Sequence, residues 1–316
     1  MDNNQILQER LKMPLSWKIQ KTSDTMASWS ANGAYISYSG GLGSRVLVDL
    51  YHKNINGTIS NMPIVFVDTG LEYPSVRSMG LKYATVVLRP EMTFKQVLEK
   101  YGYPVVSKSQ SLAVYKLRHN NLSEAYRNKL LYGDEKGTAG KLSERWKILL
   151  DAPFEVSNKC CDVIKKKPLH KFDKETGLLP MTAEMVGESR NRRDLYVKHG
   201  CQMHSLEHPK CVPMAFWTEQ DLLQYVKENN LDYAEEYGDI ECPHGGKCFT
   251  SGEDRTGCMF CMYGVHLEPP WDNRFTRMAK NHPKLYDYCI NTLGLGEVMD
   301  YMGVNYKPYP EQMKLF

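Results

Sequence analysis

The chain of 316 residues lacks several features that would limit it to particular classes of protein. No apolar run approaches the ~20 residues that a membrane-spanning helix needs. The N-terminal stretch MDNNQILQERLKMPLSW has no apolar core of the kind that secretory signals contain. Internal repeats and low-complexity tracts are also missing, which excludes solenoids and biased linkers. We therefore expect a cytoplasmic protein that does not enter a membrane.

The sequence has no large excess of either sign of charge, and its cysteines do not form an obvious set of disulfide pairs. The formal net charge of +3 is too small to predict nucleic-acid binding by itself, although a local basic patch is compatible with it. The chain has nine cysteines, an odd number that cannot all pair as disulfides, and we expect it to be cytoplasmic. That number favours metal or thiol chemistry over a framework of disulfides.

Short apolar runs that alternate with helical patterns dominate the first third of the chain. Runs at 34–39, 62–70 and 85–90 are typical of buried strands, and the segments between them have helical spacing. This order predicts an α/β fold with a doubly wound, mainly parallel sheet. The length allows one large domain with a smaller appendage. We expect an N-terminal helical segment at 1–30 and a nucleotide-binding α/β domain at 31–235, with a helical insertion at about 110–150. A Cys-rich metal-binding segment, followed by C-terminal helices and a tail, is expected at 236–316.

Two polar turns follow the first two predicted strands. Ser39-Gly40-Gly41 ends the first, and Asp68-Thr69-Gly70 ends the second. In open α/β sheets ligands bind at the carboxyl ends of strands, and a Gly-rich turn before a helix directs backbone N–H groups at an anion. A lone Gly-Gly pair is also compatible with a plain turn, but two such strand ends one helix apart favour a nucleotide site.

These motifs resemble the phosphoadenosine phosphosulfate (PAPS) reductase family of the ATP-pyrophosphatase-loop superfamily. That family usually has Ser-Gly-Gly-Lys-Asp-Ser at the first strand end, where this chain has Ser39-Gly40-Gly41-Leu42-Gly43-Ser44. The resemblance covers roughly residues 15–270. Its other motifs are FVDTGLEYP at 66–74, TFKQVLEKYGYP at 93–104, GESRNRR at 187–193 and PMAFWTEQDLLQYVKENNLDY at 213–233.

The resemblance implies an adenine nucleotide, either ATP or an adenylyl sulfate, with Mg²⁺ as a candidate companion. The turn would hold a phosphate, the second strand end would lie beside the nucleotide, and the three arginines of GESRNRR would bind a phosphate or sulfate. An alternative for those arginines is a solvated surface. The nucleotide-binding residues implied are Ser39, Gly40, Gly41, Ser44, Arg45, Asp68, Thr69, Gly70, Glu72, Arg190, Arg192 and Arg193.

The departure from the family pattern leaves two functions open. Leu42 and Gly43 stand where the family has a cation and a carboxylate, and Arg45 is a candidate for the missing positive charge. The backbone N–H groups and the helix dipole do not depend on those side chains. Nucleotide binding is therefore expected to persist, in an enzyme or in a non-catalytic nucleotide-binding or scaffold relative.

The cysteines suggest a metal centre. Cys160-Cys161 followed by Cys258-x-x-Cys261 is similar to the iron–sulfur pattern of some sulfonucleotide reductases and of the DNA phosphorothioation sulfurtransferase. Four thiolates can hold a [4Fe–4S] cluster. Two alternatives are reduced thiols without metal, and a zinc site built from Cys242, Cys248, Cys258 and Cys261 with His244 nearby. The other three, Cys201, Cys211 and Cys289, have no partner spacing and are expected in the core.

The end of the chain adds two observations on function. Sulfonucleotide reductases have a nucleophilic cysteine near the C-terminus, in a Glu-Cys-Gly-x-x-His-like motif. The last cysteine of this chain, Cys289, stands in LYDYCINTLG, which has helical spacing and lacks that motif. Plain reduction of a sulfonucleotide to sulfite is therefore not expected. The last five residues, Gln312 to Phe316, resemble the peptide that docks bacterial DNA enzymes on the sliding clamp, although a packed C-terminus is equally compatible. The sequence as a whole predicts a cluster- and nucleotide-binding protein of sulfur transfer or nucleotide-activated modification, with DNA or RNA as candidate acceptors.

Overall fold

The computed structural model describes residues 2–54, 57–59, 61–134 and 140–309. It divides into two compact units, each built from two stretches of the chain. The first unit comprises Met1–Pro90 and Lys167–Thr256, and the second comprises Glu91–Lys166 and Gly257–Phe316. Within the described part of the chain, no helix is both long and apolar enough to cross a bilayer.

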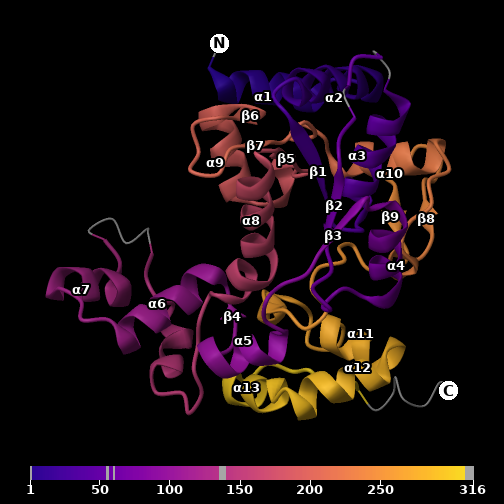
Figure 1. Ribbon diagram of the computed structural model, residues 1–316. Helices are drawn as coiled ribbons and strands as arrows, with labels where there is room; N and C mark the ends of the chain where they lie inside the picture. The colour runs from indigo at the N-terminus through magenta and orange to yellow at the C-terminus, as the bar shows by residue number, and fades with distance from the viewer. Residues whose placement is uncertain (1, 55–56, 60, 135–139, 310–316) are drawn as a thin grey trace. The chain divides into compact units, whose positions relative to one another are not determined.

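The first unit contains a six-stranded sheet in the order β3-β2-β1-β5-β7-β6 (Figure 1). All neighbouring pairs are parallel except β6–β7, which is antiparallel. The predicted α/β fold with a mainly parallel sheet is therefore confirmed. The strand bounds are Ala34–Tyr38 (β1), Ile64–Val67 (β2), Val86–Leu88 (β3), Leu179–Met181 (β5), Gln202–Met203 (β6) and Lys210–Cys211 (β7); a separate hairpin pairs Ile240–Glu241 (β8) with Phe249–Thr250 (β9).

Helices cover this sheet through apolar faces that the sequence periodicity predicts. Val46, Leu47 and Leu50 of α3 are fully buried, as are Tyr35 and Ile36 of β1. Helices α2 and α3 pack against β1, α4 packs against β2, and α10 packs against α3. The helices are Asn3–Lys12 (α1), Leu15–Ser30 (α2), Leu42–Lys53 (α3), Pro74–Tyr83 (α4), Lys167–Thr176 (α8), Arg190–His199 (α9) and Glu219–Glu228 (α10), with short 3₁₀ turns at Val186–Glu188 (η3) and Glu235–Tyr237 (η4).

The second unit is mainly helical and contains one short parallel pair. Strand β4 (Val105–Val106) pairs with β10 (Met262–Tyr263), which joins the two stretches of the chain that make up the unit. Its helical segments are Phe94–Tyr101 (α5), Lys108–His119 (α6), Glu124–Tyr132 (α7), Glu144–Leu150 (η1), Asp162–Lys166 (η2), Val265–Leu267 (η5), Arg274–Asn281 (α11), Pro283–Asp287 (α12), Tyr288–Thr292 (η6) and Leu295–Met302 (α13).

Helix boundaries follow the capping residues of the sequence. The Thr218 side chain accepts from the Asp221 N–H, and the Asp221 carboxylate accepts from the Thr218 N–H, so α10 begins with a complete capping box. Gly102 ends α5 with a φ of +92°, a conformation that glycine adopts without strain. Thr218 therefore marks the start of α10, and Gly102 marks the end of α5.

Candidate functional site

The site lies where the strand order of the first unit reverses direction. From β1 the chain proceeds to β2 and β3 on one side, while β5 and β7 pair on the other side. Because these strands are parallel, their carboxyl ends share one edge, and the switch point between β1 and β5 is where folds of this kind bind ligands. The Gly-rich turn after β1 opens at this position.

The turn is shaped by glycine conformation and by serine hydrogen bonds. Gly40 has a φ of +77°, and a Cβ there would lie 2.4 Å from the carbonyl oxygen of Val76. The Ser44 hydroxyl donates to the Gly41 carbonyl at 2.9 Å and accepts from the Ser39 N–H at 3.2 Å. The hydroxyls of Ser39 and Ser44 also share a hydrogen bond of 3.1 Å. The structure therefore brings Ser39, Gly40, Gly41 and Ser44 into one closed turn at the start of α3.

The two positions that depart from the family pattern have packing roles here. The Leu42 side chain is 4% exposed and belongs to the core. Gly43 faces Ala183 in the segment after β5, with 3.4 Å between the position of a Cβ and the Ala183 carbonyl oxygen. Position 43 therefore allows α3 to lie close to the neighbouring strand end. Neither residue offers a charge to a ligand.

Arg45 is engaged away from the turn. Its guanidinium donates two hydrogen bonds to Asp232, at 2.9 and 3.1 Å, and lies over the ring of Tyr83 with 4.3 Å to the centroid. Lys82 and the Tyr83 hydroxyl also donate to Asp232. A carboxylate thus neutralises Arg45. Burial alone would raise the pKa of Asp232, but hydrogen bonds from Lys82, Tyr83 and Arg45 outweigh that effect and lower it.

Replacing Asp232 with asparagine should destabilise the protein by about 2 kcal/mol at neutral pH, because buried Arg45 loses its partner. The lowered pKa fixes the pH dependence of this loss. The carboxylate stabilises the fold fully above about pH 4, and this stabilisation disappears as the pH falls through the depressed pKa. Urea unfolding of both proteins between pH 2 and 7 should therefore give free energies that converge at low pH. A constant difference across that range would contradict the assignment.

The second strand end forms a tight acidic turn. The buried Glu72 carboxylate accepts from the Thr69 N–H at 3.1 Å and from the Thr69 hydroxyl at 2.6 Å. Gly70 has a φ of +72°, and a Cβ there would meet open space. The structure therefore brings Asp68, Thr69, Gly70 and Glu72 together, and the face beside Gly70 is accessible.

Two arginines at this strand end were missed by the sequence reasoning. Arg77 of α4 donates two hydrogen bonds of 2.8 Å to Asp68, and Arg89, just after β3, lies 3.8 Å from the same carboxylate. The Arg77 hydrogen bonds are the main reason that the pKa of Asp68 is lowered. The position of Arg89 at the end of a predicted strand was the available signal. Both cations are partly exposed, so they remain within reach of a ligand.

The arginines of GESRNRR lie at the start of a helix. They occupy the first turn of α9, where the Ser189 hydroxyl caps the Arg192 N–H at 3.3 Å. Their side chains diverge. The Arg190 side chain is 94% exposed, Arg192 pairs with Glu184 and Glu188, and Arg193 donates to Asn4 at 3.3 Å.

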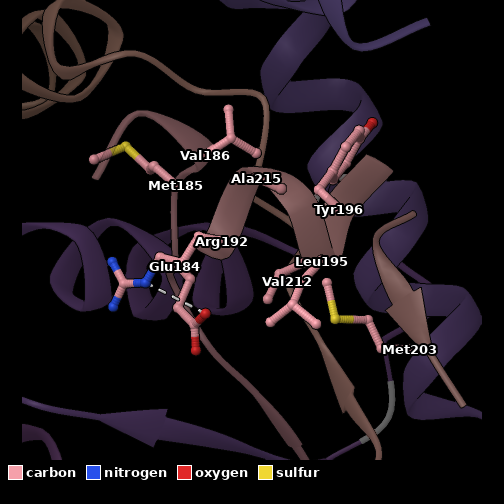
Figure 2. Close-up of a pocket in the computed structure, with 9 residues that line it drawn as sticks. All are labelled: Glu184, Met185, Val186, Arg192, Leu195, Tyr196, Met203, Val212 and Ala215. Atoms are coloured by element: carbon pink, nitrogen blue, oxygen red, sulfur yellow. Dashed lines mark ion pairs between the residues drawn. The ribbon is translucent and has the colours of Figure 1, made fainter. Parts of the chain in front are cut away.

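A small pocket lies beside this arginine turn. Figure 2 shows the Glu184–Arg192 ion pair next to mostly apolar side chains. The cavity has a volume of about 10 Å³, which is room for one water molecule and not for a nucleotide. The residues that line it are Glu184, Met185, Val186, Arg192, Leu195, Tyr196, Met203, Val212 and Ala215.

The second unit holds all four cysteines of the Cys-Cys and Cys-x-x-Cys motifs. Burial raises the pKa of the Cys160 thiol, and the neighbouring thiols of Cys161, Cys258 and Cys261 raise it further. Burial likewise raises the pKa of Cys261 to about 11, with contributions from Cys258 and Cys161. These mutual effects place the four sulfurs in one neighbourhood. Even so, no group of three or more His, Cys, Asp or Glu side chains among the described residues is arranged to hold a metal ion.

Two predictions about the remaining cysteines have opposite outcomes. Cys242 and Cys248 form a disulfide within the loop of the β8–β9 hairpin, so the preference for metal or thiol chemistry over disulfides is wrong for this pair. That pairing also removes both thiols from the alternative zinc site, because a disulfide sulfur is not a thiolate ligand. Cys201, Cys211 and Cys289 are buried, as predicted for core residues. The clamp-like residues Gln312 to Phe316 lie outside the described part of the chain.

Comparison with known proteins identifies one family. The sequence profile of the phosphoadenosine phosphosulfate reductase domain matches residues 33–261. No curated protein matches this chain. Among solved structures, a mutant of FMN adenylyltransferase from Candida glabrata aligns over 75% of this chain and 67% of its own, with 11% identity and a TM-score of 0.33.

Proposed function

Because this chain belongs to the phosphoadenosine phosphosulfate reductase domain family, we propose that it binds an adenine nucleotide, ATP or adenylyl sulfate, at the switch point of its sheet. The observation that carries the proposal is the closed turn Ser39–Ser44 at the start of α3, with an accessible second strand end beside it. Backbone N–H groups at a helix N-terminus stabilise a phosphate without a side-chain charge.

The residues of the two strand ends have separate tasks in this proposal. The turn after β1 orients one phosphate through N–H and hydroxyl donors. Arg89 is the proposed source of positive charge at the second strand end, because it is largely exposed, whereas Arg77 is paired with the Asp68 carboxylate. Arg192 has two carboxylate partners and serves to order α9, so it is a weaker candidate ligand than the family motif implies.

We also propose that Cys160, Cys161, Cys258 and Cys261 hold a [4Fe–4S] cluster. Four neighbouring thiols provide the donor set that such a cluster requires, although the side chains are not arranged as a closed metal site here. The cluster would supply electron transfer or bind sulfur. With it, the function becomes sulfur transfer or nucleotide-activated modification, with DNA or RNA as the proposed acceptor on the resemblance to the phosphorothioation enzyme.

A non-catalytic nucleotide-binding protein is the second candidate. It is favoured by Leu42 in the core, Gly43 against Ala183 and Arg45 on Asp232, because none of these replaces the missing cation and carboxylate. Conversion of ATP to AMP and pyrophosphate separates the two candidates. Sustained turnover supports the enzyme, whereas tight binding without turnover supports the second function.

Removing the Ser44 hydroxyl should weaken nucleotide binding by about tenfold or more, because the turn loses the group that links Ser39 to Gly41. Isothermal titration of wild type and Ser44→Ala with adenosine 5′-phosphosulfate and ATP measures this change. Ser205→Ala, at an exposed serine of the same unit, is the matched control and should bind like wild type. Equal affinities for all three proteins would contradict a nucleotide site at this turn.

A further inference from the structure

A tyrosine hydroxyl from far along the chain caps the Gly-rich turn. Tyr237 ends the 3₁₀ turn η4, and its side chain is buried. Its hydroxyl accepts from the Leu42 N–H at 3.2 Å and shares a hydrogen bond of 2.8 Å with the Thr256 hydroxyl. Residues 195 positions or more away in sequence thus complete the start of α3.

Three hydroxyl oxygens converge on the open side of Gly41. A Cβ on this glycine would lie 3.1 Å from the Tyr237 hydroxyl and 3.6 Å from each of the Ser39 and Thr256 hydroxyls. Ser39 is exposed, so solvent and ligands reach this space. The absence of a side chain at Gly41 therefore opens a small cradle walled by neutral hydroxyl groups.

Several hydrogen-bond donors around this cradle remain free to bind an anion. Because the Tyr237 oxygen accepts from the Leu42 N–H and shares one hydrogen bond with the Thr256 hydroxyl, one of these two hydroxyl protons stays free to point into the cradle. Among the described residues, the N–H groups of Gly43 and Ser44 have no hydrogen-bond acceptor. A phosphate oxygen at Gly41 could accept from these two N–H groups and from the free hydroxyl proton of the Tyr237–Thr256 pair.

We propose that the hydrogen-bonded hydroxyl pair of Tyr237 and Thr256 donates its one free proton to a phosphate and takes over the anchoring role of the cation and carboxylate absent at positions 42 and 43. This inference rests on the proposed function and names the ligands of that same site. Gly43 provides no carboxylate for Mg²⁺, and Arg45 is neutralised by Asp232. The ligand class is therefore the phosphate of a nucleoside monophosphate or of an adenylyl sulfate, bound without Mg²⁺, in preference to a Mg²⁺-triphosphate.

The test is the affinity for AMP and for adenosine 5′-phosphosulfate in EDTA, measured by isothermal titration. Tyr237→Phe should weaken binding by about tenfold, because a hydrogen bond to a charged group is lost while the ring is kept. Thr256→Val should also weaken binding. This second variant alters a less buried side chain than Tyr237. Adding Mg²⁺ should leave the wild-type affinity for AMP unchanged. Tyr233→Phe is the matched control, since its hydroxyl accepts from the Ile240 N–H outside the cradle.

The possible outcomes separate this inference from the proposed function. Binding by wild type that persists unchanged or becomes tighter in Tyr237→Phe and Thr256→Val overturns the hydroxyl ligands and leaves nucleotide binding intact. Weakening by Tyr233→Phe as large as that by Tyr237→Phe overturns them as well. If wild type binds neither ligand, the proposed function fails, and the inference fails with it.

Discussion

Gly40→Ala is expected to remove detectable nucleotide binding and to lower the free energy of unfolding by about 3 kcal/mol. Two independent causes act at this position. The backbone has a φ of +77°, which costs an alanine conformational energy, and the new Cβ would lie 2.4 Å from the Val76 carbonyl oxygen. Relief of that contact requires the turn to move away from α4, which displaces the N–H groups that we assign to the phosphate.

Urea denaturation and isothermal titration with adenosine 5′-phosphosulfate together measure this effect. Gly187→Ala is the matched control, because a Cβ there meets nothing within 4 Å and the backbone needs no glycine. This control should retain both stability and affinity. A Gly40→Ala protein with wild-type affinity would show that the turn does not bind the nucleotide.

The second large effect is the loss of iron from Cys261→Ser. Protein purified without oxygen should carry about four iron and four sulfide per chain, with visible absorbance, and the variant should lose most of both. The physical reason is that Cys261 is one of four mutually interacting thiols, so its removal leaves three donors for a cluster that needs four. Iron, sulfide and absorbance are read directly, so the result does not depend on activity.

Cys289→Ala is the control for this experiment. Its thiol is fully buried in the same unit, and burial is the cause of its raised pKa. The variant should keep its iron, even if the cavity lowers its stability. Wild-type protein that binds zinc in place of iron, or no metal after reconstitution, would contradict the cluster assignment.

Local pattern was enough to predict the architecture of the first unit. The continuous apolar runs at 34–39, 62–70 and 85–90 contain β1, β2 and β3. For β1 and β2 the reason is that a parallel strand buried on both faces has no polar alternation, whereas β3 lies at the sheet edge with Val87 exposed. The glycine turn at the end of β1 also followed from composition, since only glycine adopts the conformation of Gly40 at no cost. These features depend on a few consecutive residues.

Features that depend on distant residues were not predictable from such patterns. Nothing near Tyr237 in the sequence indicates that its hydroxyl reaches Leu42, or that Asp232 receives Arg45. The direction of a side chain on a helix is fixed by the partner that packs there, and that partner comes from elsewhere in the chain. The Cys242–Cys248 disulfide was missed for a related reason: spacing alone cannot distinguish a hairpin disulfide from metal ligands.

Hydrogen–deuterium exchange with and without adenosine 5′-phosphosulfate tests the central claim most directly, because it locates the nucleotide on the chain. Binding at the switch point should slow amide exchange in peptides that cover Ser39–Arg45 and Asp68–Gly70. The Gly40→Ala protein should show no such change. Protection confined to other segments, or no protection at saturating nucleotide, would contradict a nucleotide site at the carboxyl ends of β1 and β2.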